Sequence, residues 1–428
     1  MAERKGPILY LAAELPKLSE TFVYREIQGL RERGVGVVTA TVNDPAPGFT
    51  DPDLKRMAHH VVRIYGPGTK RLLLDVFAAF RAQPVRTVTG VLLGVRDALF
   101  ARRLPATKRL KSVYQCLGGI ALAHRVRGRA PTHVHAHFAH VPATVAMHCA
   151  RQLGVGFSFT GHANDLFRER SLLEPKLRRA SFVSCISEWH RLWYREVEPL
   201  ADRAAPIIRC GVDTRAFAPG PSRDATLILG VGRLVEKKGF ATLVEACALL
   251  RDRGIPFRCE IIGDGPEAGE LGERIERLGL VGVVGLAGAR PNDQVLAMVR
   301  KAAVFCLPCQ DDRDGDRDGI PVALMEAMAC GVATVAGDLP AIRELIDDGS
   351  TGRLVPGEDP AALADALAEL LGDADARETI GRRARAFLEA EFSQAVNCER
   401  LEHAFAQAGA FGGIRLPASM SDAPARSA

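Results

Sequence analysis

The sequence has little that would place the protein outside a cell or across a membrane. Ten cysteines are scattered along 428 residues, and the one C-x-x-C spacing, at Cys306 and Cys309, lacks the second pair of ligands that a structural zinc site needs. So few cysteines in a chain of this length also argue against a disulfide framework. No uncharged apolar run reaches about 18 residues, and the first residues show no cleavable signal-peptide pattern. We therefore expect a reducing, cytoplasmic compartment and no membrane-spanning helix.

Aromatic residues are also few, at 6% of the chain, whereas charged residues make up 25% and hydrophobic residues 47%. This composition is that of an ordinary soluble enzyme, and it excludes a largely disordered or collagen-like chain. At roughly 150 residues per domain, the length predicts two or three domains.

One segment carries most of the excess positive charge. The net charge of the chain is +5, but residues 70–130 contain 13 lysines and arginines against only Asp75 and Asp97. Apolar runs at 72–80 and 88–95 separate these basic residues, and aromatic residues do not alternate with them as stacking on nucleic acid requires. We therefore predict that this segment meets an anionic membrane surface and that nucleic acid is not a partner. Ordinary helices with solvated arginines are the alternative.

Short β-rich runs alternate with helical stretches along the chain, and a Pro/Gly-containing stretch at 211–223 divides the alternation in two. Such a pattern predicts parallel sheets with helices on both faces. We predict an α/β fold of two doubly wound, Rossmann-like domains that face a cleft, with the ligand beyond the carboxyl ends of the strands. The predicted parts are an N-terminal domain at 1–212, a C-terminal domain at 224–392, a helix at 393–412 that packs back toward the N-terminal domain, and a tail at 417–428.

A glycine turn, GVGRLVEKKGF at 230–240, follows the first predicted strand of the second domain. Gly232 permits a tight turn, and Arg233 and Lys238 flank the entry into a helix that we expect to begin at Lys238. Two cations beside a helix N-terminus suit a diphosphate. The segment does not match the Walker A pattern. It does not match the dinucleotide-binding fingerprint either, because Val235 stands where the third glycine of that fingerprint should be. A solvated charged turn is the alternative.

An acidic, glycine-punctuated loop at 311–319 leads into a helix that we expect to begin near Pro321. Helix N-termini bind anions and hydroxyl-rich groups, so Asp318 at the mouth of this helix is a candidate ligand contact. Glu326 lies inside the otherwise apolar helix and needs a partner, either a ligand or a core arginine. The loop also approaches a calcium-binding pattern, but the closing glutamate stands one residue too late.

Histidines are concentrated near the end of the first half. His133, His135 and His137 alternate in the predicted strand 133–138 and would share one of its faces, where we expect them to line a cleft. His162 follows the strand 155–160 and can hydrogen-bond a substrate hydroxyl or phosphate, or be an ordinary buried loop histidine. A metal-dependent hydrolase using His133, His135 and His162 is a further interpretation, although such sites need more histidines on later strands. We predict no catalytic metal.

Together and in this order, these segments resemble the retaining glycosyltransferases of family four, which have the two-domain GT-B fold. The family's glycine–arginine turn and lysine are matched by Gly232, Arg233 and Lys238, and its acidic pair by Asp318 and Glu326. The family usually has glutamate first, so Asp318 is a departure that bears on the contact with the donor sugar.

The resemblance extends from the first strand to about residue 410. The run EAMACG at 326–331 is specific to the family, and segments 15–27, 135–139 and 319–329 look most like enzymes of exopolysaccharide assembly of the colanic-acid type.

The resemblance implies that a sugar moves from a nucleoside diphosphate sugar, of UDP or GDP type, to a hydroxyl of a lipid-linked glycan with retention of configuration. It implies no cofactor, because two cations can stabilise the leaving diphosphate. It also implies a peripheral location on the inner face of the cytoplasmic membrane. The implied donor-binding residues are Gly232, Arg233, Lys238, Asp318, Gly319, Ile320 and Glu326. The implied catalytic residues are His162, Arg233, Lys238 and Asp318. A non-catalytic carbohydrate- or lipid-binding protein stays open beside the hydrolase as an alternative.

Overall fold

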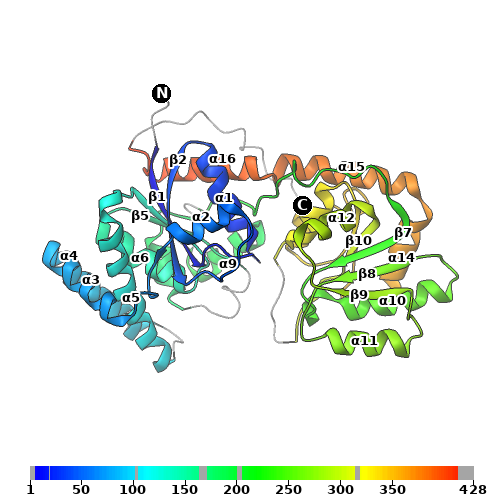
Figure 1. Cartoon of the computed structure of the whole chain (residues 1–428), viewed down its shortest axis with the longest axis horizontal. Helices are drawn as coiled ribbons and strands as arrows, with labels where there is room; N and C mark the ends of the chain where they lie inside the picture. The colour runs from blue at the N-terminus through cyan, green and yellow to red at the C-terminus, as the bar shows by residue number, and fades with distance from the viewer. Residues whose placement is uncertain are drawn as a thin grey trace. The chain divides into compact units, whose positions relative to one another are not determined.

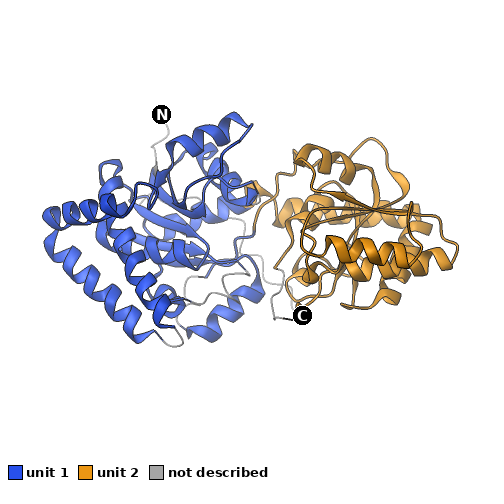
Figure 2. Cartoon of the chain, turned by 60° about the horizontal axis from the view of Figure 1, so that its bottom comes forward, with its two compact units in different colours: residues 1–209, 397–428 blue, residues 210–396 orange. Residues whose placement is uncertain are grey.

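The computed structural model describes residues 5–18, 20–101, 105–162, 171–199, 205–313 and 319–412. The chain forms two compact units (Figure 2), of which unit 1 comprises residues 1–209 and 397–428 and unit 2 comprises residues 210–396. Each unit is built around one six-stranded parallel sheet.

The sheet of unit 1 has the strand order β3-β2-β1-β4-β5-β6. The chain adds β2 and β3 on one side of β1 and then returns to add β4, β5 and β6 on the other, which is the doubly wound order. The strands are β1 (Lys5–Glu14), β2 (Val35–Asn43), β3 (Val62–Arg63), β4 (His133–His137), β5 (Gly156–Thr160) and β6 (Phe182–Ser184).

Helix α1 (Thr21–Glu32) shows how the sequence sets this packing. Val23, Ile27 and Leu30 recur at helical spacing, and all three are buried in the apolar cluster that contains strand β1. Gly34, at a φ of +82°, turns the chain toward β2 where a residue with a side chain would be strained. The other helices that cover this sheet are α2 (Pro52–His60), α6 (Val141–Leu153), α8 (Leu173–Arg179) and α9 (Glu188–Val197).

The last helix, α16 (Gln394–Gln407), belongs to unit 1 from residue 397 onward. Leu401, Ala404 and Phe405 on this helix are buried in the same apolar cluster as Ile8 and Tyr10 of β1. Helix α16, late in the sequence, therefore packs in the same core as strand β1, which comes first.

The basic region folds as the helices α3 (Thr69–Ala82), α4 (Pro84–Phe100) and α5 (Ala106–Val126), which project at one side of unit 1 (Figure 1). Both acidic side chains of this region are buried in ion pairs. Asp75 accepts hydrogen bonds from Arg71 and Arg125, and Asp97 is held by Arg179 on α8. The charge that these helices show to solvent is consequently basic.

The outer surface of these three helices is also apolar. Among the described residues, eleven of the fourteen exposed large apolar side chains lie on them, and we call this set the exposed apolar face. The set comprises Leu73, Leu74, Phe77, Phe80, Val85, Val88, Leu92, Leu99, Phe100, Leu110 and Tyr114. Within the described part of the chain, no helix has the length and hydropathy to span a membrane.

The sheet of unit 2 repeats the doubly wound order, as β12-β11-β10-β7-β8-β9. Its strands are β7 (Asp224–Val231), β8 (Arg258–Ile262), β9 (Val284–Gly288), β10 (Ala302–Leu307), β11 (Ala333–Gly337) and β12 (Arg353–Val355). The helices are α10 (Phe240–Asp252), α11 (Ala268–Arg277), α12 (Asn292–Lys301), α13 (Val322–Ala329), α14 (Pro360–Gly372) and α15 (Ala374–Glu391). Cys306 and Cys309 are buried in this core.

The run PIIRC at 206–210 predicts a strand from its sequence, but it forms only a single bridge, between Ile207 and Cys185 at the end of the first sheet, so this prediction is wrong. Pairing stops there because the chain passes into unit 2 at residue 210.

Candidate functional site

The topology of unit 2 marks one place where a ligand of this sheet would bind. The chain leaves β7 to build β8 and β9 on one side, and it returns through β10 to build β11 and β12 on the other. The connections that follow the neighbouring strands β7 and β10 therefore lead toward opposite edges of the sheet. In doubly wound sheets, ligands bind at the carboxyl ends of the strands at such a switch point.

The turn after β7 holds the three residues predicted to bind a diphosphate. Gly232 follows the strand, Arg233 is exposed, and Lys238 closes a 3-10 turn at Glu236–Lys238. A methyl group placed on Gly232 would lie 3.6 Å from the Cδ atom of Lys238, so the lysine stem runs beside this glycine. The structure thus brings the stem of Lys238 back to Gly232 at the start of the turn.

The helix after this turn begins later than predicted. Gly239 adopts a φ of +68°, and α10 begins at Phe240 rather than at Lys238. A Cβ atom on Gly239 would lie 2.0 Å from the carbonyl oxygen of Pro308, which follows β10. Only glycine fits this approach, so the helix cannot start until the chain has passed it.

Two further contacts join the turn after β7 to the loop after β10. The backbone N–H of Gln310 donates to the carbonyl oxygen of Lys237 at 3.0 Å, and the guanidinium of Arg313 pairs with the carboxylate of Glu236 at 2.9 Å. The exposed ion pair contributes little energy by itself. The backbone bond and the close approach at Gly239 fix the two loops against one another. Sequence reasoning missed Gln310, because no local pattern shows that its backbone pairs across the switch point.

Helix α13 carries the remaining residues of this predicted site. Gly319 and Ile320 precede it, both half-buried, and Glu326 lies half-buried in its second turn. Asp318 falls outside the described residues, as do Asp314 and Asp316 of the calcium-like pattern. The structure therefore places Gly232, Arg233, Lys238, Gly319, Ile320 and Glu326 on the loops and helix that follow the two strands of the switch point.

In unit 1, the three alternating histidines of β4 share one face, as predicted, but they do not line a cleft. His133, His135 and His137 are at most 1% exposed. The Ser158 hydroxyl lies 2.8 Å from both His133 Nε2 and His135 Nδ1, and the Thr160 hydroxyl lies 3.1 Å from His135 Nε2. Hydroxyls at every second position of β5 thus satisfy both ring nitrogens of His135 and one of His133, whose Nδ1 is buried without a hydrogen-bond partner.

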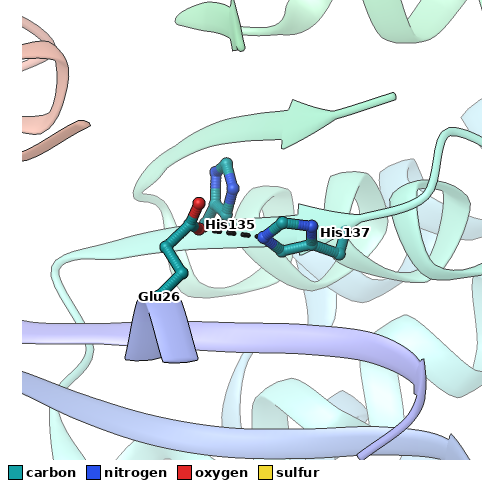
Figure 3. Close-up of side chains that lie close together, drawn as sticks. All are labelled: Glu26, His135 and His137. Carbon is teal, nitrogen blue, oxygen red and sulfur yellow. Dashed lines mark hydrogen bonds and ion pairs between the residues drawn. The ribbon is translucent and has the colours of Figure 1, made fainter. Parts of the chain in front are cut away.

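Three side chains of unit 1 lie close enough together to surround a metal ion (Figure 3): Glu26, His135 and His137, whose ligand atoms are all within 4.8 Å of one another. Hydrogen bonds already account for this proximity, because His135 uses both ring nitrogens on hydroxyls and His137 Nε2 pairs with the Glu26 carboxylate at 2.9 Å. An ion would have to displace these bonds. Within the described ranges, the set His133, His135 and His162 does not come together as a group of ligands, so the hydrolase set is wrong.

His162 lies two residues beyond the end of β5. Its ring contacts Phe22 of α1 and Phe138, at centroid distances of 4.7 and 4.9 Å, and its Nε2 lies 3.2 Å from His137 Nδ1. Burial, helped by the neighbouring His137, holds the pKa of His162 well below its usual value. Sequence reasoning found His162 but missed Glu26, which only the packing of α1 on the sheet brings to the histidines.

Two other buried histidines of unit 1 should make the free energy of unfolding depend on pH. Burial lowers the pKa of His148 and of His190 to about 4. Each is neutral in the fold but takes up a proton near pH 6.5 when unfolded, so the unfolded state binds more protons between pH 6.5 and about 4. The free energy of unfolding should therefore fall as pH drops through this window, by about 1.4 kcal/mol per pH unit for each histidine.

Urea unfolding at pH 7, 6 and 5 measures this slope. His190→Gln should reduce it by one proton, whatever it does to stability at pH 7, whereas His60→Gln should leave it unchanged because His60 is exposed. An unchanged slope in His190→Gln would show that this ring is already charged in the fold.

Comparisons with known proteins agree with the predicted resemblance. Residues 213–387 match the family model described as glycosyl transferases group 1. A glycosyltransferase of Escherichia coli (strain K12) named for colanic acid biosynthesis, WcaL, is 39% identical over 194 residues, which are 44% of this chain and 48% of the relative. The amylovoran biosynthesis glycosyltransferase AmsK of Erwinia amylovora is 37% identical over 218 residues, 49% of this chain and 53% of the relative. The chain thus spans about half the length of these curated relatives.

Solved structures match over nearly the whole chain. HepE of Anabaena, in complex with UDP, superposes with a TM-score of 0.67 and 15% identity over 94% of this chain and 99% of that structure. The sucrose-phosphate synthase of Thermosynechococcus elongatus gives a TM-score of 0.67 and 18% identity over the same shares. These likenesses concern the fold, and they confirm the predicted GT-B fold.

Proposed function

We propose that this chain, whose residues 213–387 match the family model of group 1 glycosyl transferases, moves a sugar from a nucleoside diphosphate sugar to a hydroxyl of a glycan in exopolysaccharide synthesis. The single observation that carries the proposal is the joined pair of loops at the switch point of unit 2. One loop presents Arg233 and Lys238, and the other leads to Glu326. The colanic acid and amylovoran relatives support the exopolysaccharide setting.

The chemistry of unit 2 suits a diphosphate leaving group. When the bond from the sugar to the diphosphate breaks, negative charge grows on the phosphate oxygens, and two fixed cations stabilise that charge. We propose that Arg233 and Lys238 do this, without a metal. The acceptor hydroxyl attacks from the face of the leaving group so that the configuration is retained, and its proton passes to the departing diphosphate oxygen. Asp318 would contact the transferred sugar and Glu326 the ribose. For His162 of unit 1 we propose the catalytic role that the resemblance implies.

A thermal-shift screen of the full chain tests the donor class. Ligands at about 100 times their dissociation constant stabilise a fold by about 2.7 kcal/mol, which raises the melting temperature by several degrees. We expect such a shift with a nucleoside diphosphate and its sugar, with UDP and GDP as the bases to compare. Absence of a shift with all nucleoside diphosphates would remove the proposal.

We also propose that the acceptor is lipid-linked and that unit 1 docks on an anionic membrane, on the cytoplasmic face, through the exposed apolar face. Eleven apolar side chains on three basic helices are more than scattered surface residues, and their two acidic neighbours are buried. Apolar side chains would enter the interface while the lysines and arginines meet anionic headgroups, at about 1 kcal/mol for each basic residue near the surface.

Vesicle co-sedimentation tests this docking. Binding should rise with the fraction of anionic lipid and fall with salt. Phe77→Glu and Leu92→Glu, which place a carboxylate on the exposed apolar face, should each weaken binding by roughly tenfold or more, because burying such a side chain is worth about 1.5–3 kcal/mol.

The control for docking is Val281→Glu, which puts the same charge at an exposed valine of unit 2. It should leave vesicle binding unchanged. Equal partitioning of the wild-type chain to neutral and anionic vesicles would contradict the docking and leave the donor chemistry untouched.

A further inference from the structure

We propose that an open pocket on unit 1, lined by Arg63, Pro67, Arg71 and Arg125, binds the headgroup phosphate of an anionic phospholipid. The inference rests on the proposed docking of unit 1 on a membrane. It adds one specific site to an attraction that all the basic residues of these helices otherwise share. The family match begins at residue 213 and does not include this pocket.

The pocket has a volume of about 390 Å³, which is within the range of small-molecule sites. Its walls come from the end of β3, the loop before α3, the first turn of α3 and the last turn of α5. Three of the four lining residues are arginines. A guanidinium group is planar and can donate two parallel hydrogen bonds to one phosphate, so this lining suits a phosphate better than it suits an apolar ligand.

Arg125 holds the walls of the pocket together. Its side chain is only 12% exposed, and its Nε donates to the carboxylate of Asp75 on α3 at 2.6 Å. Its guanidinium also donates to the carbonyl oxygens of Arg63 and Ile64 at 2.5 and 2.8 Å. These bonds join α5 to α3 and to the end of β3. Arg63 and Arg71 are much more exposed, at 49% and 61%, so their guanidinium groups can reach a ligand.

The positive charge of the pocket exceeds the negative charge beside it. The Asp75 carboxylate is shared by Arg71 and Arg125, so one carboxylate balances two guanidinium groups. The Asp44 carboxylate lies 3.8 Å from the guanidinium of Arg63, and both side chains are about half exposed. Such an exposed pair contributes little energy, so a phosphate can compete with Asp44 for this arginine.

Helix α3 begins at the pocket, between Pro67 and Arg71. Its N-cap is Gly68, which has no side chain to accept from the N–H groups of the first turn, and this turn contains no acidic residue. It contains Lys70 and Arg71 instead, although cations are unfavourable at a helix N-terminus. A bound phosphate would relieve this arrangement, because it accepts from the N–H groups and pairs with the cations.

The exposed apolar face begins next to the pocket. Leu73 and Leu74 follow Lys70 at spacings of three and four residues, so they share one side of α3 with it. Both leucines are more than half exposed. A phospholipid joins a phosphate to apolar chains in one molecule and can therefore fill the pocket and cover these leucines together. Free phosphate offers nothing to the leucines, so the neighbouring apolar surface favours the lipid as the occupant.

The pocket also lies at the edge of the sheet where ligands of this fold bind. β3 runs parallel to β2, with Arg63 opposite Thr41, so the loop that follows β3 lies at the carboxyl ends of the strands. His162 follows β5 at the same edge, four strand spacings away, which is roughly 20 Å along the sheet. A lipid held in this pocket would bring the membrane surface to the edge at which a lipid-linked acceptor would have to react.

Co-sedimentation of the full chain with vesicles that contain phosphatidylglycerol tests the site. Arg63→Gln and Arg71→Gln should each weaken vesicle binding roughly 10–150-fold, the effect of losing hydrogen bonds to a charged group. Arg81→Gln is the matched control, because it removes the same charge from an exposed position in the last turn of α3. It should weaken binding by no more than about fivefold, the general contribution of one basic residue near an anionic surface.

Equal losses in the three variants would overturn the site and leave the docking of the basic helices in place. A wild-type chain that does not bind these vesicles would overturn both. Arg63→Gln leaves the bonds of Asp75 untouched, so it reports on the site even if Arg71→Gln lowers the stability of the fold. The shift of the melting temperature with a nucleoside diphosphate should be the same in all variants, which keeps the donor chemistry separate.

Inorganic phosphate distinguishes a site from simple screening by salt. At equal ionic strength, phosphate should displace the wild-type chain from the vesicles more effectively than chloride does, whereas the two salts should act alike on Arg71→Gln. Equal displacement of the wild type by both salts would overturn the site. If Arg71→Gln loses its affinity for inorganic phosphate but binds vesicles as the wild type does, the pocket holds a free anion and the lipid assignment is wrong.

Discussion

Arg233→Ala and Lys238→Ala should each reduce the rate of sugar transfer by about 10²–10³-fold, the effect of removing one fixed donor that stabilises charge in a transition state. The binding of a nucleoside diphosphate should weaken roughly 10–150-fold, because a hydrogen bond to a charged group is worth about 1.5–3 kcal/mol. Both effects arise because these cations lie in the turn after β7, where a backbone bond and a glycine contact fix it against the loop after β10. Initial rates and titration calorimetry measure the two quantities.

Arg253→Ala is the matched control for these variants. Arg253 caps the far end of α10 and pairs with Asp365 in an exposed ion pair, so its removal takes away the same charge from unit 2 at a distance from the switch point. It should bind the nucleotide and turn over as the wild type does. Wild-type affinity and rate in both Arg233→Ala and Lys238→Ala would show that the turn is only a solvated charged surface.

Glu326→Ala and Asp318→Asn should fail in different ways. Glu326 lies in the second turn of α13, and we propose that it accepts hydrogen bonds from the ribose, so its loss should weaken both the bare nucleotide and the full donor by roughly 10–150-fold. Asp318 precedes this helix in sequence and would face the transferred sugar. Its change to asparagine should leave nucleotide affinity intact and lower turnover, as expected of a contact that strengthens in the transition state.

Glu273→Ala removes an exposed carboxylate from α11 of the same unit and should match the wild type in both measurements. Calorimetry with the bare nucleotide and with the sugar nucleotide separates the two acids. If Asp318→Asn abolishes binding of the bare nucleotide while Glu326→Ala preserves it, the roles are the reverse of those proposed.

The fold followed from the sequence because alternating apolar runs and glycine-ended helices are local signals. One such signal is the helical spacing of Val23, Ile27 and Leu30, all of which are buried in α1. Taken together, these local signals predicted the doubly wound order that both sheets have. Local signals failed where a tertiary contact decides the outcome. The start of α10 depends on how closely Gly239 approaches Pro308, and the run 206–210 stops pairing because the chain leaves the sheet.

The residues of the candidate site likewise divide into those that a local pattern predicts and those that only tertiary packing brings together. Arg233 and Lys238 are close in sequence, so their proximity could be predicted from one turn. The histidines of β4 were placed on the correct face but in the wrong surroundings, since alternation alone does not reveal that Ser158 and Thr160 of the next strand hydrogen-bond His133 and His135 in the core. Glu26 is separated from His137 by more than one hundred residues, and only the packing of α1 joins them.

The central claim is sugar transfer from a nucleoside diphosphate sugar with retention of configuration. Its most direct test is a proton NMR assay with the donor that the thermal-shift screen selects, a lipid extract as the source of acceptor, and a chelator throughout. We expect release of the nucleoside diphosphate together with a glycoside whose anomeric configuration equals that of the donor. A product of inverted configuration, or a reaction that starts only when a metal ion is added back, would contradict it.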